Sequence, residues 1–420
     1  MREMKPSSME WVGDIPASWK VMPNKYLMYK KKEICPVYNG EDILSLTMKG
    51  VIVRDLDAGG KMPTSFDGYQ RLEPGNLLMC LFDIDVTPRC IGLIKQTGLS
   101  SPAYSQFVLC DNANAAYYCY YYTMLDNDKT LFHLAKNLRH SLTEDQLGAI
   151  PVIVPPMDEQ QRIADFLDVK CAEIDALTAD IQTQIDTLEQ YKRSVITETV
   201  TKGLNPNAEM RNSGIQWIGN MPSSWSVLKG KYMFAQRSLR GNSIELQLLS
   251  PTQKFGVIPQ TRYEELSGMN AVKLNEKADL SLFKTIHKGD FCISLRSFQG
   301  GFEYSEYEGV VSPAYQVFYP TVEIADGYYR YLFKEQGFIE KMNSYTMTLR
   351  DGKNIAFSDF GNTYIPYPPL TEQSEIAAYL NSKCAQINAL ITEKQQQLAT
   401  LDEYKKSLIF EYVTGKKEVV

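Results

Sequence analysis

Residues that commonly carry chemistry are few in this chain, and none stands in a catalytic or metal-binding pattern. Eight cysteines are scattered without a Cys-x-x-Cys pair, and the only three histidines are His133, His140 and His287. Zinc sites and nucleophilic triads need such residues as partners at defined spacings. Asp83 and Asp85 lack the following lysine or glutamate that a metal-dependent nuclease site would add. The sequence therefore predicts no catalytic residue and no metal site.

Motifs that bind nucleotides and cofactors are also missing. The chain has no Gly-x-x-x-x-Gly-Lys-Ser/Thr phosphate loop and no Gly-x-Gly-x-x-Gly dinucleotide loop. It also lacks Asn-Pro-Pro-Tyr, with which an amino-methyltransferase would grip a flipped base, and the Gly-x-Ser-x-Gly elbow of hydrolases. We therefore expect the chain to bind no cofactor of its own.

Composition indicates a globular protein of several domains. The 420 residues are 44% hydrophobic and 22% charged, and at roughly 100–200 residues per domain they predict two to four domains. No apolar run approaches the ~20 residues that cross a bilayer, and the first residues lack the apolar core of a signal peptide. We expect a cytoplasmic protein with reduced cysteines and no membrane partner. The formal net charge of −6 does not by itself indicate nucleic-acid binding.

The four tryptophans reveal an internal repeat. Trp11 and Trp19 stand at the same spacing as Trp217 and Trp225, which lie 206 residues further on. Around the first of each pair, Glu-Trp-Val-Gly-Asp-Ile-Pro is matched by Gln-Trp-Ile-Gly-Asn-Met-Pro. Further ordered matches join 44–52 with 249–258, 101–104 with 312–315, and 155–164 with 368–377. The chain is therefore a tandem duplication, in which each half is a globular unit followed by a long helix.

Two long helices are predicted from segments without glycine or proline. These run from Glu159 to about Thr201 and from Glu372 to about Val413, roughly 40 residues or ~60 Å each. Their apolar residues recur at intervals of seven, which is typical of a coiled coil. If the halves are related by pseudo-twofold symmetry, the two helices pair antiparallel. The expected interface residues are Leu167, Ile174, Leu177, Ile181, Leu188, Leu380, Ile387, Leu390, Leu401 and Leu408.

The segments before the helices predict mixed α/β units with substantial strand content. Short apolar runs there are separated by glycine turns, as at 76–82 and 290–295. Between the matched landmarks the halves differ, and the tyrosine run 117–122 has no counterpart run in the second half. The expected organisation is globular domain 1 over 1–157, a central helix over 158–203, globular domain 2 over 204–370 and a C-terminal helix over 371–420. One α/β scaffold thus carries two different surfaces.

This arrangement resembles the specificity subunit of type I restriction-modification systems. The resemblance lies in the Trp-x-Gly-x-x-Pro-x-x-Trp openings, the Ser-Pro-Ala-Tyr segments and the helices that follow Pro-Pro-x-x-Glu-Gln-x-x-Ile. It covers essentially the whole chain. It implies that each globular unit is a target recognition domain reading one half of a split site in double-stranded DNA. It also implies that the helices set the gap between half-sites and dock two methyltransferase subunits.

The same resemblance places the chemistry on partner subunits. Methyltransferase subunits would bring S-adenosylmethionine, and motor-nuclease subunits would bring ATP hydrolysis and magnesium-dependent cleavage. The absence of catalytic motifs agrees with this division of labour. The chain would then be a non-catalytic specificity subunit.

Neither globular half is basic overall, so DNA contacts would need a segregated face. Arg139 and Arg350 occupy similar places shortly before the Pro-Pro segments, and Lys49 and Lys254 occupy matched loops. The candidate DNA-binding residues are Lys49, Arg89, Tyr104, Arg139, Arg237, Lys254, Arg296, Tyr315, Arg350 and Lys353. Two other functions stay open: a coiled-coil protein scaffold without DNA readout, and a nuclease with an unrecognised site.

Overall fold

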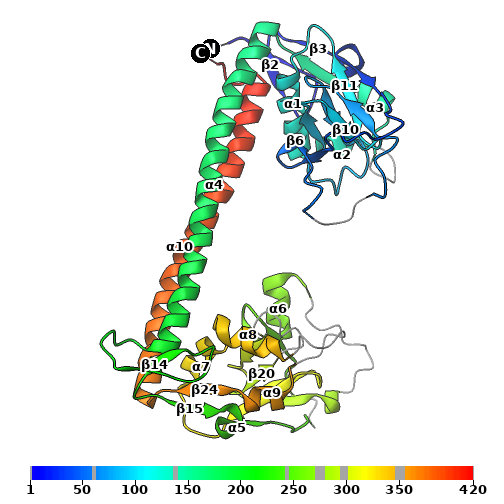
Figure 1. Cartoon of the computed structure of the whole chain (residues 1–420). Helices are drawn as coiled ribbons and strands as arrows, with labels where there is room; N and C mark the ends of the chain where they lie inside the picture. The colour runs from blue at the N-terminus through cyan, green and yellow to red at the C-terminus, as the bar shows by residue number, and fades with distance from the viewer. Residues whose placement is uncertain are drawn as a thin grey trace. The chain divides into compact units, whose positions relative to one another are not determined.

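The structure is a computed structural model of the chain. It describes residues 2–58, 63–135, 141–241, 246–269, 280–293, 301–345 and 355–419. The chain forms two compact units, of which unit 1 comprises Met1–Gln182 and Gln395–Val420, and unit 2 comprises Thr183–Lys394. The two long helices, α4 (Met157–Lys202) and α10 (Leu370–Val413), each contribute one half to each unit (Figure 1). The compact units therefore do not coincide with the two halves of the sequence.

Unit 1 is built on a four-stranded antiparallel sheet of order β4-β11-β8-β9, against which α1 packs. Smaller strand pairs surround it: β1 with β2, β3 with β12, β5 with β6, and β7 with β10. The strands are β1 (Met4–Pro6), β2 (Asp14–Pro16), β3 (Lys20–Pro23), β4 (Met28–Lys31), β5 (Leu44–Thr47), β6 (Gly50–Val53), β7 (Gln70–Leu72), β8 (Leu77–Met79), β9 (Ile91–Leu93), β10 (Gly98–Ser100), β11 (Ser105–Leu109) and β12 (Pro151–Val154). The helices are η1 (Asn24–Tyr26), α1 (Ala115–Asn127), α2 (Thr130–Leu134) and α3 (Glu144–Ala149).

Unit 2 repeats this topology. Its four-stranded sheet has the order β16-β23-β20-β21, and its smaller pairs are β13 with β14, β15 with β24, β17 with β18, and β19 with β22. The strands are β13 (Met210–Asn212), β14 (Asn220–Pro222), β15 (Ser226–Lys229), β16 (Phe234–Gln236), β17 (Leu249–Thr252), β18 (Gly256–Pro259), β19 (Lys284–Ile286), β20 (Phe291–Ile293), β21 (Phe302–Tyr304), β22 (Gly309–Val311), β23 (Gln316–Pro320) and β24 (Tyr364–Tyr367). The helices are α5 (Gly230–Met233), α6 (Gln260–Ser267), η2 (Leu280–Leu282), α7 (Asp326–Leu332), α8 (Gln336–Ser344) and α9 (Phe357–Asn362). The predicted duplication of a mixed α/β unit followed by a long helix is thus confirmed.

The second tryptophan of each repeat, Trp19 or Trp225, joins its domain to the first turn of the long helix that follows it. Trp19 is fully buried, and its indole Nε1 donates to Glu159 Oε2 of α4 at 2.9 Å. In unit 2, Trp225 Nε1 donates to Glu372 Oε2 of α10 at 2.8 Å. A carboxylate in the first turn also complements the positive end of the helix dipole. The repeated tryptophan and the repeated Pro-Pro-x-x-Glu are therefore two parts of one joint.

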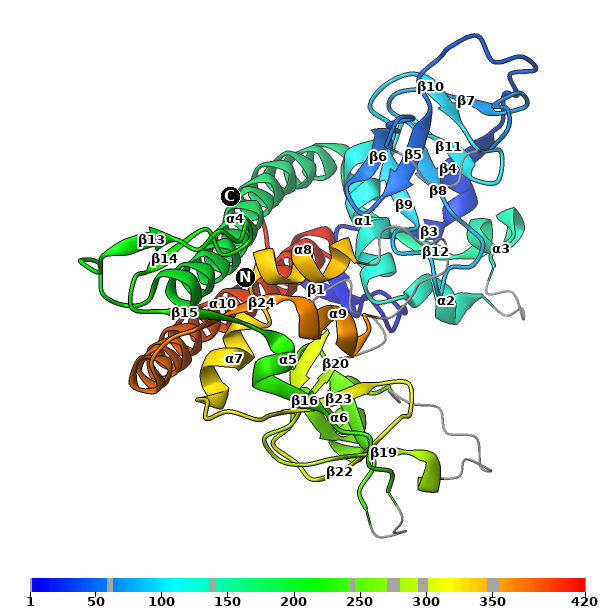
Figure 2. The same cartoon turned by 60° about the horizontal axis from the view of Figure 1, so that its bottom comes forward.

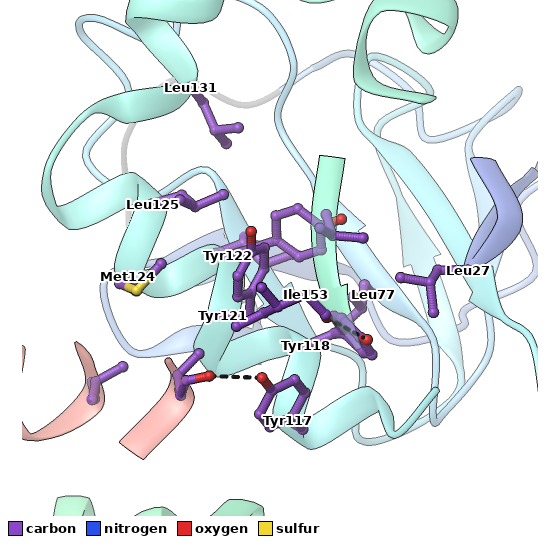
Figure 3. Close-up of a cluster of buried hydrophobic side chains, with 14 of the residues drawn as sticks. Leu27, Leu77, Tyr117, Tyr118, Tyr121, Tyr122, Met124, Leu125, Leu131 and Ile153 are labelled. Carbon is purple, nitrogen blue, oxygen red and sulfur yellow. Dashed lines mark hydrogen bonds between the residues drawn. The ribbon is translucent and has the colours of Figure 1, made fainter. Parts of the chain in front are cut away.

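Buried tyrosines hold the end of the other long helix in each unit. Tyr117 of α1 donates its hydroxyl to the carbonyl of Val413, near the end of α10, at 2.7 Å (Figure 3). Tyr328 of α7 does the same to the carbonyl of Val200 of α4, also at 2.7 Å. Tyr328 is thus the structural counterpart of Tyr117. The second half has no matching tyrosine run, as the sequence indicates, but it keeps the tyrosine that holds the helix end.

The halves of the two long helices pack antiparallel within each unit. In unit 1, the rings of Phe166 (α4) and Tyr412 (α10) lie 4.4 Å apart, and Lys405 Nζ contacts Asp175 Oδ1 at 2.6 Å. Residues later in α4 thus contact residues earlier in α10, which is the antiparallel arrangement. In unit 2, Lys192 Nζ of α4 donates to Asn388 Oδ1 of α10 at 2.7 Å. Of the expected interface residues, Leu167, Ile174, Ile181, Leu380, Ile387 and Leu408 are buried, while Leu188 and Leu401 are half-buried.

Leu177 and Leu390 lie outside this buried seam, because each keeps 47% of its surface exposed. They were expected to continue the seam that starts at Ile163 and Ile376, which are buried. An α-helix with 3.6 residues per turn drifts by about 20° per seven residues, so two heptads turn a side chain about 40° away. Ile185, which the sevenfold pattern omits, is buried instead. No helix in the described ranges is long and apolar enough to cross a membrane.

The end of α10 docks on the opening segment of unit 1. Lys416 Nζ donates to the carbonyl of Val12 at 2.8 Å. Gly415 has φ +70°, and a Cβ built there would lie 2.6 Å from the Pro16 ring and 2.7 Å from the Trp19 indole. Glycine is therefore needed at this position both for its backbone conformation and for space.

We predict that Gly415→Ala destabilises unit 1 more than a glycine replacement that causes backbone strain alone. Gly219 is the matched control, since its φ is +68° and a Cβ there would meet nothing within 4 Å. We expect Gly219→Ala to cost about 1–2 kcal/mol of unfolding free energy. Gly415→Ala should cost about 1–3 kcal/mol more because of overpacking. Hydrogen exchange of unit 1 and unit 2 amides measures the unfolding free energy that each variant loses. Equal losses would contradict the docking of Gly415 against Pro16 and Trp19.

Candidate nucleic-acid interface

A hairpin occurs at the matched position of each unit, with a two-residue loop (48–49) in unit 1 and a three-residue loop (253–255) in unit 2. In the β5–β6 hairpin, Thr47 Oγ1 donates to the carbonyl of Gly50 at 3.0 Å. In the β17–β18 hairpin, Thr252 Oγ1 donates to the carbonyl of Gly256, also at 3.0 Å. Both loops expose a lysine two residues after the threonine, Lys49 in unit 1 and Lys254 in unit 2. The described structure thus presents two of the candidate DNA-binding residues as matched cations.

Arg89 and Arg237 are instead held inside their own domains. Arg89 Nη1 lies 3.3 Å from the buried carboxylate of Asp126 and donates to Asn127 Oδ1 at 2.9 Å. Arg237 donates from Nε and Nη2 to Asp290 at 2.6 and 2.9 Å. Its guanidinium also lies 4.4 Å from the centroid of the Tyr319 ring. These ion pairs compensate buried carboxylates, so we assign both arginines to the scaffold in place of the expected DNA contact.

Tyr104 and Tyr315, the tyrosines of the Ser-Pro-Ala-Tyr segments, are half-buried scaffold residues. The Tyr104 ring stacks on Phe82 with centroids 6.1 Å apart, and burial raises the pKa of its hydroxyl. The carbonyl of Tyr104 accepts a hydrogen bond from Gln70 Nε2 at 2.8 Å. The carbonyl of Tyr315 accepts one from Lys284 Nζ at 2.6 Å. The segments therefore serve as turns that lead into the central strands.

Four further candidate DNA contacts were expected from the sequence. Arg139, Arg296, Arg350 and Lys353 lie outside the described residues. They stay predictions. Of the ten candidates, Lys49 and Lys254 are therefore the two that the structure describes as exposed cations.

Unit 1 contains a cleft of about 510 Å³ beside its hairpin. It is lined by the β5–β6 turn, β9, α1, the first half of α4 and the second half of α10. Figure 2 shows this hairpin next to β9 and α1. Where the two long helices line this cleft, charged side chains pair with one another. Lys405 contacts Asp175, and Lys406 contacts Asp402 at 2.7 Å. Within the described residues, no group of three or more His, Cys, Asp or Glu could hold a metal ion.

Each unit also presents the same trio of side chains on its long helices, an exposed leucine and tyrosine beside a half-buried lysine, which we call its helix face. The helix face of unit 1 comprises Lys170, Leu177 and Tyr404, and that of unit 2 comprises Lys383, Leu390 and Tyr191. Lys383 Nζ lies 5.5 Å from the centroid of the Tyr191 ring. In unit 1, Tyr404 contributes electrostatically to the raised pKa of Lys170, behind the larger effect of Glu173. The sequence pattern had assigned both leucines to the buried interface, so this surface was missed.

We predict that Arg237→Ala lowers the stability of unit 2 by about 3 kcal/mol, because it leaves the buried Asp290 carboxylate without its cation. Lys254→Ala is the matched control. Its side chain is exposed, so we expect a change within about 0.5 kcal/mol. Denaturant unfolding of the two variants provides the comparison. If the two variants were equally stable, Arg237 would not be needed to compensate Asp290, and it would again be a candidate DNA contact.

Comparisons with known proteins agree with this architecture. The family described as type I restriction modification DNA specificity domain matches residues 101–187 and 240–400. A putative type I restriction enzyme MjaX specificity subunit from Methanocaldococcus jannaschii is 24% identical over 318 residues, which are 72% of this chain and 68% of that protein. The MjaVIII specificity subunit of the same organism is 26% identical over 287 residues, or 64% of this chain and 63% of that protein.

Two solved structures share the fold. A chain from a study of complex assembly and conformational transition of the type I R-M system has a TM-score of 0.69 and 14% identity, covering 96% of this chain and 99% of its own. The HsdS subunit from Thermoanaerobacter tengcongensis has a TM-score of 0.51 and 14% identity, covering 98% of this chain and 100% of its own. The family match extends over more than half of the sequence, in both repeats. The chain belongs to the family of type I restriction-modification DNA specificity domains.

Proposed function

We propose that this chain is the DNA-reading specificity subunit of a type I restriction-modification complex, with each globular domain reading one half of a bipartite site. The observation that carries the proposal is the duplication of one scaffold whose matched surfaces differ. Two equal surfaces would suit a palindromic site or a repeated protein partner. Unlike surfaces on like scaffolds suit two half-sites of different sequence.

The lysines at the hairpin tips support contact with duplex DNA. Lys49 and Lys254 occupy the same exposed position in their domains, so they suit the sugar-phosphate backbone, which is alike in both half-sites. Backbone contacts position a protein on DNA, while contacts to base edges specify the sequence. We propose Arg139 and Arg350, with Arg296 and Lys353, as further contacts from the segments outside the described residues.

Two methyltransferase subunits are the proposed occupants of the two helix faces. The faces repeat the same residue types, Lys-Leu-Tyr, and like faces suit two copies of one partner. In this proposal the chain itself performs no catalysis. Methyltransferase subunits bring S-adenosylmethionine, and motor-nuclease subunits bring ATP and magnesium. The complex acts on duplex DNA in the cytoplasm.

We predict that removing one helix face removes one methyltransferase subunit. Leu177→Ala with Tyr404→Ala should leave one partner bound instead of two, and so should Leu390→Ala with Tyr191→Ala. Truncating exposed apolar and aromatic anchors should weaken each contact about tenfold or more. Native mass spectrometry of the co-expressed complex counts the subunits.

Val169→Ser provides the control for this experiment. Val169 is exposed on α4, but its counterpart in the repeat is Ser382, so it belongs to no shared face. This variant should keep both methyltransferase subunits. Two bound subunits in every variant would mean that docking uses another surface.

The proposed function is tested by mapping methylated sites in DNA exposed to the complete complex. We expect a bipartite motif with a gap of fixed length. Inserting four residues after Gln182 in α4, with four more after Lys394 in α10, adds ~6 Å to each helix and about 40° of rotation. At ~3.4 Å per base pair, the gap should grow by one or two base pairs while both half-sites keep their sequence.

Three results would count against this function. Methylation without any defined motif would favour a protein scaffold that does not read DNA. A lengthened helix pair with an unchanged gap would show that the helices do not act as the spacer. DNA cleavage by the chain without partner subunits would point to a nuclease.

A further inference from the structure

The two matched hairpins bear the same residues on their outer faces but expose them differently. In unit 1, Ser45 pairs with Ile52 across the β5–β6 hairpin. In unit 2, Ser250 pairs with Ile258 across the β17–β18 hairpin. Opposite residues of an antiparallel pair lie on one face, so the two faces correspond. Ile52 is 40% exposed, whereas Ile258 is 7% exposed and Ser250 is fully buried.

Helix α6 begins directly after β18 and packs against both strands of the hairpin. The Ser250 hydroxyl of this hairpin is buried and has no hydrogen-bond partner among the described residues, whereas Ser45 is only half-buried. In unit 1, no helix occurs in the described residues that follow β6, 54–58 and 63–69. The matched face is therefore exposed in unit 1 and buried in unit 2, where a helix follows the hairpin.

The exposed hairpin of unit 1 and helix α6 of unit 2 are two shapes that the DNA major groove accepts. That groove is about 12 Å wide and admits either a two-stranded ribbon or an α-helix. No residue of α6 is buried, and its Arg262 and Glu265 side chains are largely exposed. Two copies of one protein partner would bind two like faces, but the outer faces of the two hairpins differ. Lys49 and Lys254 beside these faces complement the phosphates that border the groove.

Resting on the proposed function, we infer that unit 1 reads its half-site with the outer face of the β5–β6 hairpin and that unit 2 reads the other with α6. The hairpin offers apolar Ile52 and Met48, which suit the thymine methyl group. Helix α6 offers Arg262 and Glu265, an exposed pair 2.7 Å apart. Arginine suits guanine and glutamate suits the amino group of cytosine. The hairpin therefore selects an A·T pair, and α6 selects a G·C pair.

The test uses the full chain in its complex with the partner methyltransferase and maps the methylated motif. We expect Ile52→Ser to relax one position of the first half-site only, lowering discrimination about tenfold or more. Arg262→Ala should relax one position of the second half-site only. Ser250→Ala is the matched control for the hairpin face, because that residue is fully buried. It should leave both half-sites unchanged.

The outcomes separate this inference from the function on which it rests. Ile52 and Arg262 are exposed, so the thermal melting temperatures of both variants should stay near the wild-type value. If the wild-type motif is bipartite and both variants keep it unchanged, the hairpin and α6 are not the reading elements, and the proposed function stands. If the wild-type complex methylates no defined motif, the proposed function itself fails.

Discussion

The hydrogen bond between a buried tryptophan and a glutamate in the first turn of a helix is the contact on which the architecture depends. It occurs twice, from Trp19 to Glu159 and from Trp225 to Glu372. Each bond ties a domain opening to the start of the long helix that follows that domain, more than a hundred residues later in the chain. A buried indole N–H without its acceptor would cost free energy, so the helix start has one favourable position. In unit 1, Arg2 reinforces the joint through an ion pair with Glu159 at 2.6 Å.

The second joint makes each unit a mixture of both halves of the sequence. A tyrosine hydroxyl holds a carbonyl near the end of the other helix, Tyr117 at Val413 and Tyr328 at Val200. Each domain therefore holds the start of one long helix and the end of the other. Because both joints are repeated, the helix segments exposed by the two units are also repeated. The matched helix faces follow from this packing, and they are the basis for proposing two copies of one partner.

The proposed DNA-reading surfaces of the two units differ in segments that the shared scaffold does not constrain. In both hairpins the threonine before the loop, Thr47 or Thr252, donates to the carbonyl of the glycine after it, although the loop is one residue longer in unit 2. The residues after the hairpin are free to vary, since the sheet of each unit forms without them. Among the described residues, a helix follows the hairpin in unit 2 only, so the same scaffold carries a different surface there. A specificity protein needs this separation of scaffold from contact surface, because different half-sites must be read without changing the fold.

Much of the architecture was determined by the sequence alone. The spacing of the tryptophans and the Pro-Pro-x-x-Glu-Gln segments established the duplication, because repeated landmarks in order leave little room for another topology. Tertiary structure decided which side chains are free. Leu177 fits a sevenfold pattern but turns outward as the helix drifts from that period, and Arg89 and Arg237 neutralise buried carboxylates from distant segments. Likewise only the fold shows that Ile258 is buried while Ile52 stays exposed, since burial depends on what packs around a residue and not on its type.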